Sequence, residues 1–145
     1  MARPLLRQAL AVVAGFVAGS VVNMGLVMLG PAVVPPPEGA DVTTTEGLKA
    51  SMHLFEGKHF VFPFLAHALG TLAGAIVATR ITPGRTAGPA LVVGGLFLLG
   101  GIAAAMMLPA PRWFEALDLV LAYLPAAWLG HRIAARGADS TVASA

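Results

Sequence analysis

The segment KHFVFPFLAHALGTLAGAIVATR, from Lys58 to Arg80, contains no charged residue between its two ends when histidine is neutral. A helix that crosses a membrane needs about 20 mainly apolar residues, and the uncharged part of this segment has that length. Polar and charged residues on both sides mark its limits. We therefore predict a transmembrane helix over residues 60–80.

Three further segments have the same character. Two of them are uncharged, while the last, residues 113–131, is weaker because it contains Glu115 and Asp118. The chain has 145 residues and is 57% hydrophobic but only 11% charged, whereas soluble domains have about 25% charged residues. This composition predicts an all-α integral membrane protein, a single-domain four-helix bundle with spans near residues 8–30, 60–80, 87–108 and 113–131.

The arginines predict the orientation of this bundle. They precede the first span, fill the loop between the second and third, and follow the fourth, at Arg3, Arg7, Arg80, Arg85, Arg132 and Arg136. The positive-inside rule then places both termini in the cytoplasm, as an even number of spans also requires. The basic residues are scattered singly, so the lipid bilayer is the predicted partner and nucleic acid is not.

The long connection over residues 31–59 is predicted to lie on the outer side. Its segment TTTEGLKASMHLFE predicts a short helix, with Thr43 and Glu46 at capping-box spacing. Apolar residues of this helix fall on one face, namely Leu48, Met52 and Phe55. An amphipathic helix beside a membrane is expected to lie in the interface. The small polar tail, residues 137–145, is predicted to be disordered.

Small residues recur at every fourth position in the first two spans. Gly15 and Gly19 share a face of the first, and Gly70 and Gly74 share a face of the second. This G-x-x-x-G spacing lets helix backbones approach closely in lipid. The partner helix can lie in the same bundle, in a second copy that forms a homo-oligomer, or in a larger membrane complex.

Polar side chains interrupt three of the spans at similar depths. Asn23, His67 and Asp118 are expected about 10, 10 and 8 Å below the outer surface, at 1.5 Å per residue. An ionisable residue at membrane depth indicates a functional site by default. We predict that these three residues form a cluster inside the bundle, which Glu115 extends towards the surface. Hydrogen bonds that only fix helix register, a proton or substrate path, and a metal site all stay open.

A second group of residues on the outer side predicts, more weakly, a metal site. It contains the types of side chain that bind copper or zinc, at His53, Glu56, His59, Met24 and Met28. His53 and Glu56 share a helical face if the loop helix includes both, and thioethers with imidazoles suit Cu(I). Methionine also fills gaps in apolar cores, so no cofactor is predicted outright.

The segments PPPEGAD, ASMHLFEGKHFVFPFLAHALGT and LPAPRWFEALDLVLAYLPAAWLG resemble parts of small bacterial four-span integral membrane proteins of no established function. The resemblance covers residues 35–130. It implies a location in the bacterial inner membrane, and it implies no activity.

Three classes of function follow from these patterns. The first expectation is a structural or accessory membrane component without catalysis. The second is a membrane protein that binds a metal or small ligand through its outer His, Met and Glu residues. The third is a proton-coupled carrier or membrane enzyme that uses Asp118 and His67. An enzyme is the less favoured of these, because no nucleophile arrangement and no G-x-S-x-G, H-E-x-x-H, P-loop or dinucleotide motif is present.

Overall fold

The computed structural model describes the backbone of residues 2–142 and the side chains of residues 4–136. Within these residues all regular secondary structure is helical and there is no strand. Three helices are long and apolar enough to cross a membrane: α1 (Ala2–Val33), α3 (Val61–Ile81) and α4 (Gly88–Met107). The prediction of an all-α protein is confirmed, and three of the predicted spans coincide with helices that have the length and composition needed to cross a membrane.

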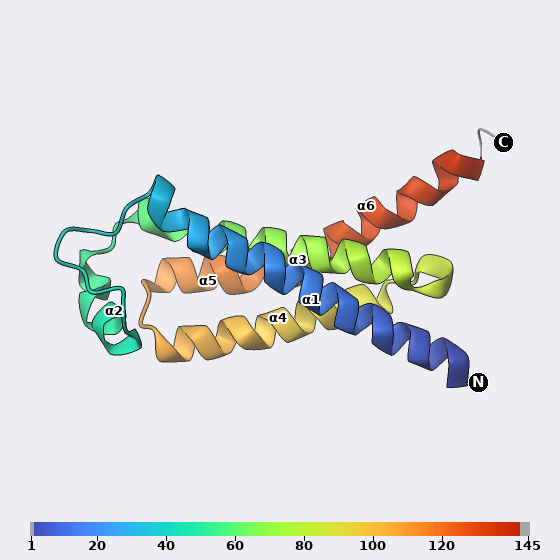
Figure 1. The fold of residues 1–145 in the computed structure, drawn as a ribbon, viewed down its shortest axis with the longest axis horizontal. Coiled ribbons are helices and arrows are strands. Elements are labelled where there is room, and N and C mark those ends of the chain that lie inside the picture. Colours follow the sequence, from blue (N-terminus) through green and yellow to red (C-terminus); the bar gives the residue numbers. More distant parts are fainter. Residues whose placement is uncertain (1, 143–145) are drawn as a thin grey trace.

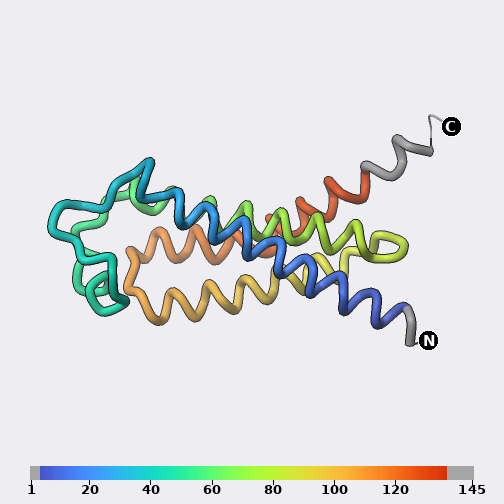
Figure 2. Tube along the Cα trace, in the orientation of Figure 1, coloured from blue at the N-terminus to red at the C-terminus, as the bar shows by residue number. Residues whose placement is uncertain are grey.

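The helices alternate in direction along one long axis, as the tube in Figure 2 shows. After α4 the chain continues through α5 (Arg112–Leu121) and α6 (Leu124–Val142). The connection with α2 (Thr45–Ser51) closes one end of the bundle, and α1 begins and α6 ends at the opposite end (Figure 1). The α3–α4 turn, where Gly84 adopts a φ of +69°, also lies away from α2.

Helices α1 and α3 pack through the predicted glycines. A Cβ added to Gly15 would lie 2.6 Å from the carbonyl oxygen of Gly74, and one added to Gly19 would lie 2.6 Å from that of Gly70. Such contact requires the absence of a side chain on both helices. The two G-x-x-x-G faces therefore meet each other inside this chain.

The predicted fourth span, residues 113–131, is not one continuous helix. It divides into α5, which ends at Leu121, and α6, which begins at Leu124. Pro125 has no N–H to bond the carbonyl of Leu121, and its ring crowds the preceding turn. Ala122 and Tyr123 at the break are buried.

Below the break, α6 packs closely on its neighbours through small residues. A Cβ on Gly130 would lie 2.6 Å from the carbonyl oxygen of Leu72, and one on Gly94 would lie 2.6 Å from the Cβ of Ala127. Arg85 donates a hydrogen bond of 2.8 Å to the carbonyl of Ala134, which ties the α3–α4 turn to α6. The helices are therefore closely packed in the half of the bundle that contains the α3–α4 turn.

The loop helix is shorter than predicted and is capped one residue later. Thr44, not Thr43, is the N-cap, and its hydroxyl accepts from the backbone N–H of Gly47. The α-helix ends at Ser51, a single 3₁₀ turn covers Met52–Leu54, and Glu56 is extended. At the other end of the chain, α6 reaches Val142, inside the predicted disordered tail (137–145), whose last three residues lie outside the described part.

Candidate ligand-binding site

The structure brings together His67 of α3 and Asp118 of α5. The Nδ1 atom of His67 lies 2.9 Å from each carboxylate oxygen of Asp118. The Asp118 side chain is 6% exposed and that of His67 is 26% exposed. With Asp118 ionised, Nδ1–H is the donor, and this partner fixes the tautomer of the imidazole. The Nε2 atom is then the hydrogen-bond acceptor of the ring.

Tyr123 is a third member of this site that the sequence did not suggest. Its hydroxyl donates a hydrogen bond of 2.9 Å to Oδ2 of Asp118, and its ring stacks on His67 with a centroid distance of 5.6 Å. Gly101 of α4 makes room for it, because a Cβ there would collide with the Tyr123 ring. We call these residues the His67–Asp118–Tyr123 cluster.

The other two predicted members of the polar cluster have different roles. Asn23 packs on Gly70, where an added Cβ would lie 2.9 Å from the Asn23 Cβ. Its Oδ1 atom is buried and has no hydrogen-bond partner in the described part of the chain. The prediction that Asn23 bonds with His67 and Asp118 is therefore wrong, because its place on α1 directs it to the α1–α3 contact.

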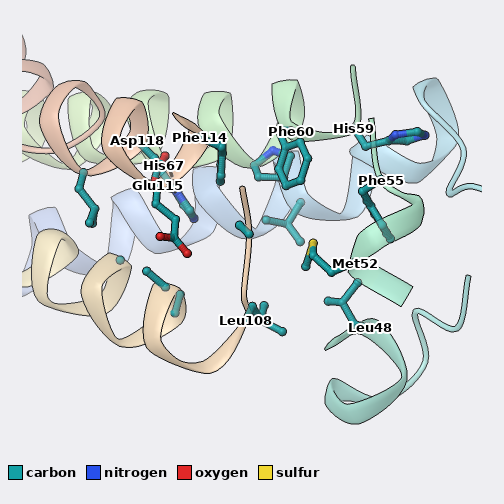
Figure 3. A pocket seen from close by; sticks show the side chains of 17 residues that line it. Leu48, Met52, Phe55, His59, Phe60, His67, Leu108, Phe114, Glu115 and Asp118 are labelled. Atoms are coloured by element: carbon teal, nitrogen blue, oxygen red, sulfur yellow. Dashed lines mark hydrogen bonds and ion pairs between the residues drawn. The ribbon is translucent and has the colours of Figure 1, made fainter. Parts of the chain in front are cut away.

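Glu115 stands one turn before Asp118 on α5 and reaches into a cavity. This cavity, the α2-side cavity, has a volume of about 300 Å³. Its walls are mainly apolar and come from α1, the α2 connection, α3, α4 and α5, and they include Val27, Leu48, Met52, Phe55, Phe60, Ala104, Ala105, Leu108 and Phe114. Figure 3 shows His67, Glu115 and Asp118 at one end of this cavity and the α2 connection at the other.

Apolar residues of the loop form one end of the cavity. Leu48, Met52 and Phe55, the predicted apolar face of the loop helix, line the α2-side cavity. Phe60 connects them to α5, since its ring lies 6.4 Å from that of Phe55 and 4.7 Å from that of Phe114. The loop thus covers the end of the bundle with its own hydrophobic side.

The residues proposed for a metal site do not gather. His53 Nδ1 lies 2.9 Å from the carbonyl of Ala50, and His59 Nδ1 accepts from the backbone N–H of Glu56 at 2.9 Å. The helix ends between His53 and Glu56, so they do not share a helical face as predicted.

The remaining predicted metal ligands do not complete a site either. Met24 and Met28 are 56% and 73% exposed on α1. No three His, Asp or Glu side chains with metal-binding geometry occur among the described residues. The described residues thus give no support to a copper or zinc site, and binding of either metal stays a prediction.

The polar groups do not continue through the bundle. Thr71, one turn after His67 on α3, is fully buried and its hydroxyl has no partner within the described residues. The next polar contact joins Thr79 and His131, 3.4 Å apart. Between Thr71 and Thr79 lies Ala75, which packs with Ala90 and Ala127 in a fully buried apolar cluster.

A comparison with protein-family models, a search of curated proteins and a search of solved structures each gave no match to this chain. Its function is therefore inferred from the chemistry of the cavity.

Proposed function

We propose that this protein is a multi-pass inner-membrane protein that binds a small, largely apolar ligand in the α2-side cavity. The observation that supports this proposal is the combination of an apolar cavity of about 300 Å³ with a buried polar cluster at one end. Ligand pockets usually measure about 300–1,000 Å³ and have a few convergent polar groups among apolar walls. In this role the polar cluster orients the ligand, and the walls supply most of the binding energy.

The proposed topology has four crossings, with both termini in the cytoplasm and the cavity on the outer side. The broken α5–α6 segment is the fourth crossing. Discontinuous helices in membrane proteins commonly border binding sites, because their irregular backbone is tolerated only beside protein or a cavity. In this arrangement a ligand enters from the outer surface or from the outer half of the bilayer.

The expectation of a structural or accessory component receives less support. It relied on glycine faces that seek a partner helix, and the faces of α1 and α3 are occupied by each other. A proton-coupled carrier also has less support, because Ala75, Ala90 and Ala127 separate the polar cluster from Thr79 and His131. Both classes remain alternatives that the following experiment separates from ligand binding.

The test compares two alanine-to-phenylalanine variants of α4. Ala105 lines the cavity, so Ala105→Phe fills part of it, whereas Ala103 is exposed on the outside of the bundle and Ala103→Phe is the control. Each protein is purified from its own membrane in mild detergent, and small molecules that remain bound are measured by native mass spectrometry. We expect bound compounds on the wild type and on Ala103→Phe, and none on Ala105→Phe. Equal occupancy of all three proteins would contradict the proposal.

A further inference from the structure

We infer that the α2-side cavity is selective for a lipophilic amine, an apolar molecule whose protonated nitrogen is held by Glu115. This inference rests on the proposed function and specifies its ligand class. Two carboxylates line the cavity, those of Glu115 and Asp118, and no lysine or arginine lines it among the described residues. The other titratable side chains of the lining are His59 and His67. A cationic head group is therefore complementary to the cavity, and an anionic one is not.

The two carboxylates differ in how far their charge is already balanced. Asp118 accepts hydrogen bonds from the Tyr123 hydroxyl and from the His67 imidazole, and these engage both of its oxygens. Glu115 makes no side-chain hydrogen bond or ion pair that the described residues reveal. Glu115 is thus the group with acceptor capacity left for a ligand, while Asp118 is held inside the polar cluster.

Glu115 and Asp118 share one side of α5, since they are three residues apart on a helix. Figure 3 shows the Glu115 side chain extending into the space between α5 and α4, with Asp118 and His67 behind it. A nitrogen bound to Glu115 would thus stand in front of the polar cluster, and its apolar body would extend towards Phe60 and Met52. A charged group in such apolar surroundings is strongly unfavourable unless a counter-ion is present. The Glu115 carboxylate is a counter-ion for a cation only, and this difference supplies the selectivity for an amine.

Phenylalanine rings next to this position support the same head group. Phe114 precedes Glu115 on α5 and also lines the cavity, and Phe60 packs on it with a centroid distance of 4.7 Å. Aromatic faces attract cations through their quadrupole. They offer no comparable attraction to a carboxylate.

The experiment compares three probes that share one apolar body: 4-cyclohexylbutylamine, 4-cyclohexylbutan-1-ol and 4-cyclohexylbutanoate. The full-length protein is placed in nanodiscs of zwitterionic phosphatidylcholine at neutral pH. Trp113 reports binding, because its ring lies 5.8 Å from that of Phe60, a residue of the cavity wall. Trp128→Phe removes the other tryptophan signal. Glu115→Gln is the test variant, and Glu38→Gln, at an exposed carboxylate of the outer connection, is the matched control.

We expect the amine to bind at least about tenfold more tightly than the alcohol, as one charge-assisted hydrogen bond provides, and the carboxylate to bind most weakly. Glu115→Gln should abolish the preference for the amine, and Glu38→Gln should keep it. If amine and alcohol bind equally to the wild type, or if the carboxylate binds best, the amine inference is overturned and the ligand cavity stands. If none of the probes binds saturably, the proposed function fails together with the inference.

Discussion

At the scale of single residues, Asp118 is the most unusual feature of the molecule. A carboxylate on an apolar helix is costly unless it is paired and hydrogen-bonded. Here the imidazole of His67 and the hydroxyl of Tyr123 satisfy it from two directions. The result is a hydrogen-bonded polar group at the end of an apolar cavity, which the proposed ligand-binding role requires.

The Tyr123 hydroxyl is expected to contribute measurably to stability through Asp118. Tyr123→Phe removes the donor and keeps the ring that stacks on His67. We expect a loss of about 1 kcal/mol in the free energy of unfolding, the usual size of one such hydrogen bond in a membrane protein. Unfolding by a denaturing detergent measures it. In an Asp118→Ala background the same substitution should have almost no effect, and an undiminished loss there would rule out the contact.

The sequence predicted the meeting of His67 and Asp118 but not the part of Tyr123, and both outcomes have a physical reason. Depth along a helix follows from residue counting, so His67 and Asp118 were correctly placed at one level. Asn23 lies four residues after Gly19, so counting also places it on the face of α1 that packs on α3. Counting along one helix does not show whether that face also meets His67 and Asp118. Tyr123 was missed because, on a continuous helix, a residue five positions after Asp118 points about 140° away from it. The break before Leu124 redirects it.

At the scale of elements, glycine contacts decide how α1 lies on α3. Gly19 meets the backbone of Gly70, whereas Gly25 of the same helix has no atom within 4 Å of an added Cβ. These two positions provide a matched pair of substitutions. They separate the cost of a steric contact from the general effect of replacing glycine in a helix.

We expect Gly19→Ala to destabilise the bundle by about 1–3 kcal/mol, the typical cost of overpacking. The contact is with a carbonyl oxygen, which cannot rotate away as a side chain can. Gly25→Ala should be neutral or stabilising by up to about 1 kcal/mol, because alanine favours the helix. Thermal unfolding in detergent compares both with the wild type. Equal effects of the two substitutions would mean that α1 and α3 do not pack through this face.

Asp41 organises the start of α2, and we expect it to make this connection sensitive to acid. It accepts hydrogen bonds from the hydroxyl and the backbone N–H of Thr43, at 2.6 and 2.9 Å. These bonds, the side-chain one first, lower the pKa of the Asp41 carboxyl below its ordinary value. A lowered pKa in the folded state means that the stabilisation is present above the unfolded value, about 3.9, and is lost as pH falls through the folded one.

Amide hydrogen exchange of residues 41–51, corrected for the intrinsic rate at each pH, tests this dependence. The wild type should keep its protection at neutral pH and lose it in strong acid. Asp41→Ala should lack that protection throughout, and the control Glu38→Ala should behave as the wild type does. Protection that is independent of both pH and Asp41 would show that the connection is held in another way.

The prediction of helices succeeded where a long uncharged segment indicated them. It failed where the helix boundary depends on a few neighbouring residues. Long uncharged segments identified α1, α3 and α4, because burial in lipid depends on overall composition. The fourth segment combines charged residues with Pro125, and its break depends on where the Leu121 carbonyl and the Tyr123 side chain find partners. The loop helix was predicted too long because apolar residues continue at helical spacing past Ser51. The backbone leaves the α-helical conformation there and continues as a 3₁₀ turn.

At the scale of the whole molecule, the α2 connection lies at one end of the bundle, and α1 begins and α6 ends at the other (Figure 1). The proposed topology places the α2 end outside and the α3–α4 turn inside. The chain has no cysteine, so single introduced cysteines report their own position. Glu38→Cys lies in the outer connection and Thr86→Cys in the α3–α4 turn, and both positions are exposed.

Intact cells treated with a thiol reagent that cannot cross the membrane should label Glu38→Cys and leave Thr86→Cys unlabelled. Permeabilised cells should label both, which controls for reactivity. The reverse pattern would show that the protein has the opposite orientation in the membrane. Labelling of both positions in intact cells would exclude an odd number of membrane crossings between them.

Every functional inference depends on the meeting of His67 and Asp118, and a double-mutant cycle tests that contact most directly. His67→Ala, Asp118→Ala and the double variant are unfolded in the same detergent, with His53→Ala, at an exposed position of the loop, replacing His67→Ala in a control cycle. We predict a coupling free energy of about 1 kcal/mol or more between His67 and Asp118, and additivity within about 0.5 kcal/mol between His53 and Asp118. Additive effects of His67 and Asp118 would contradict the account.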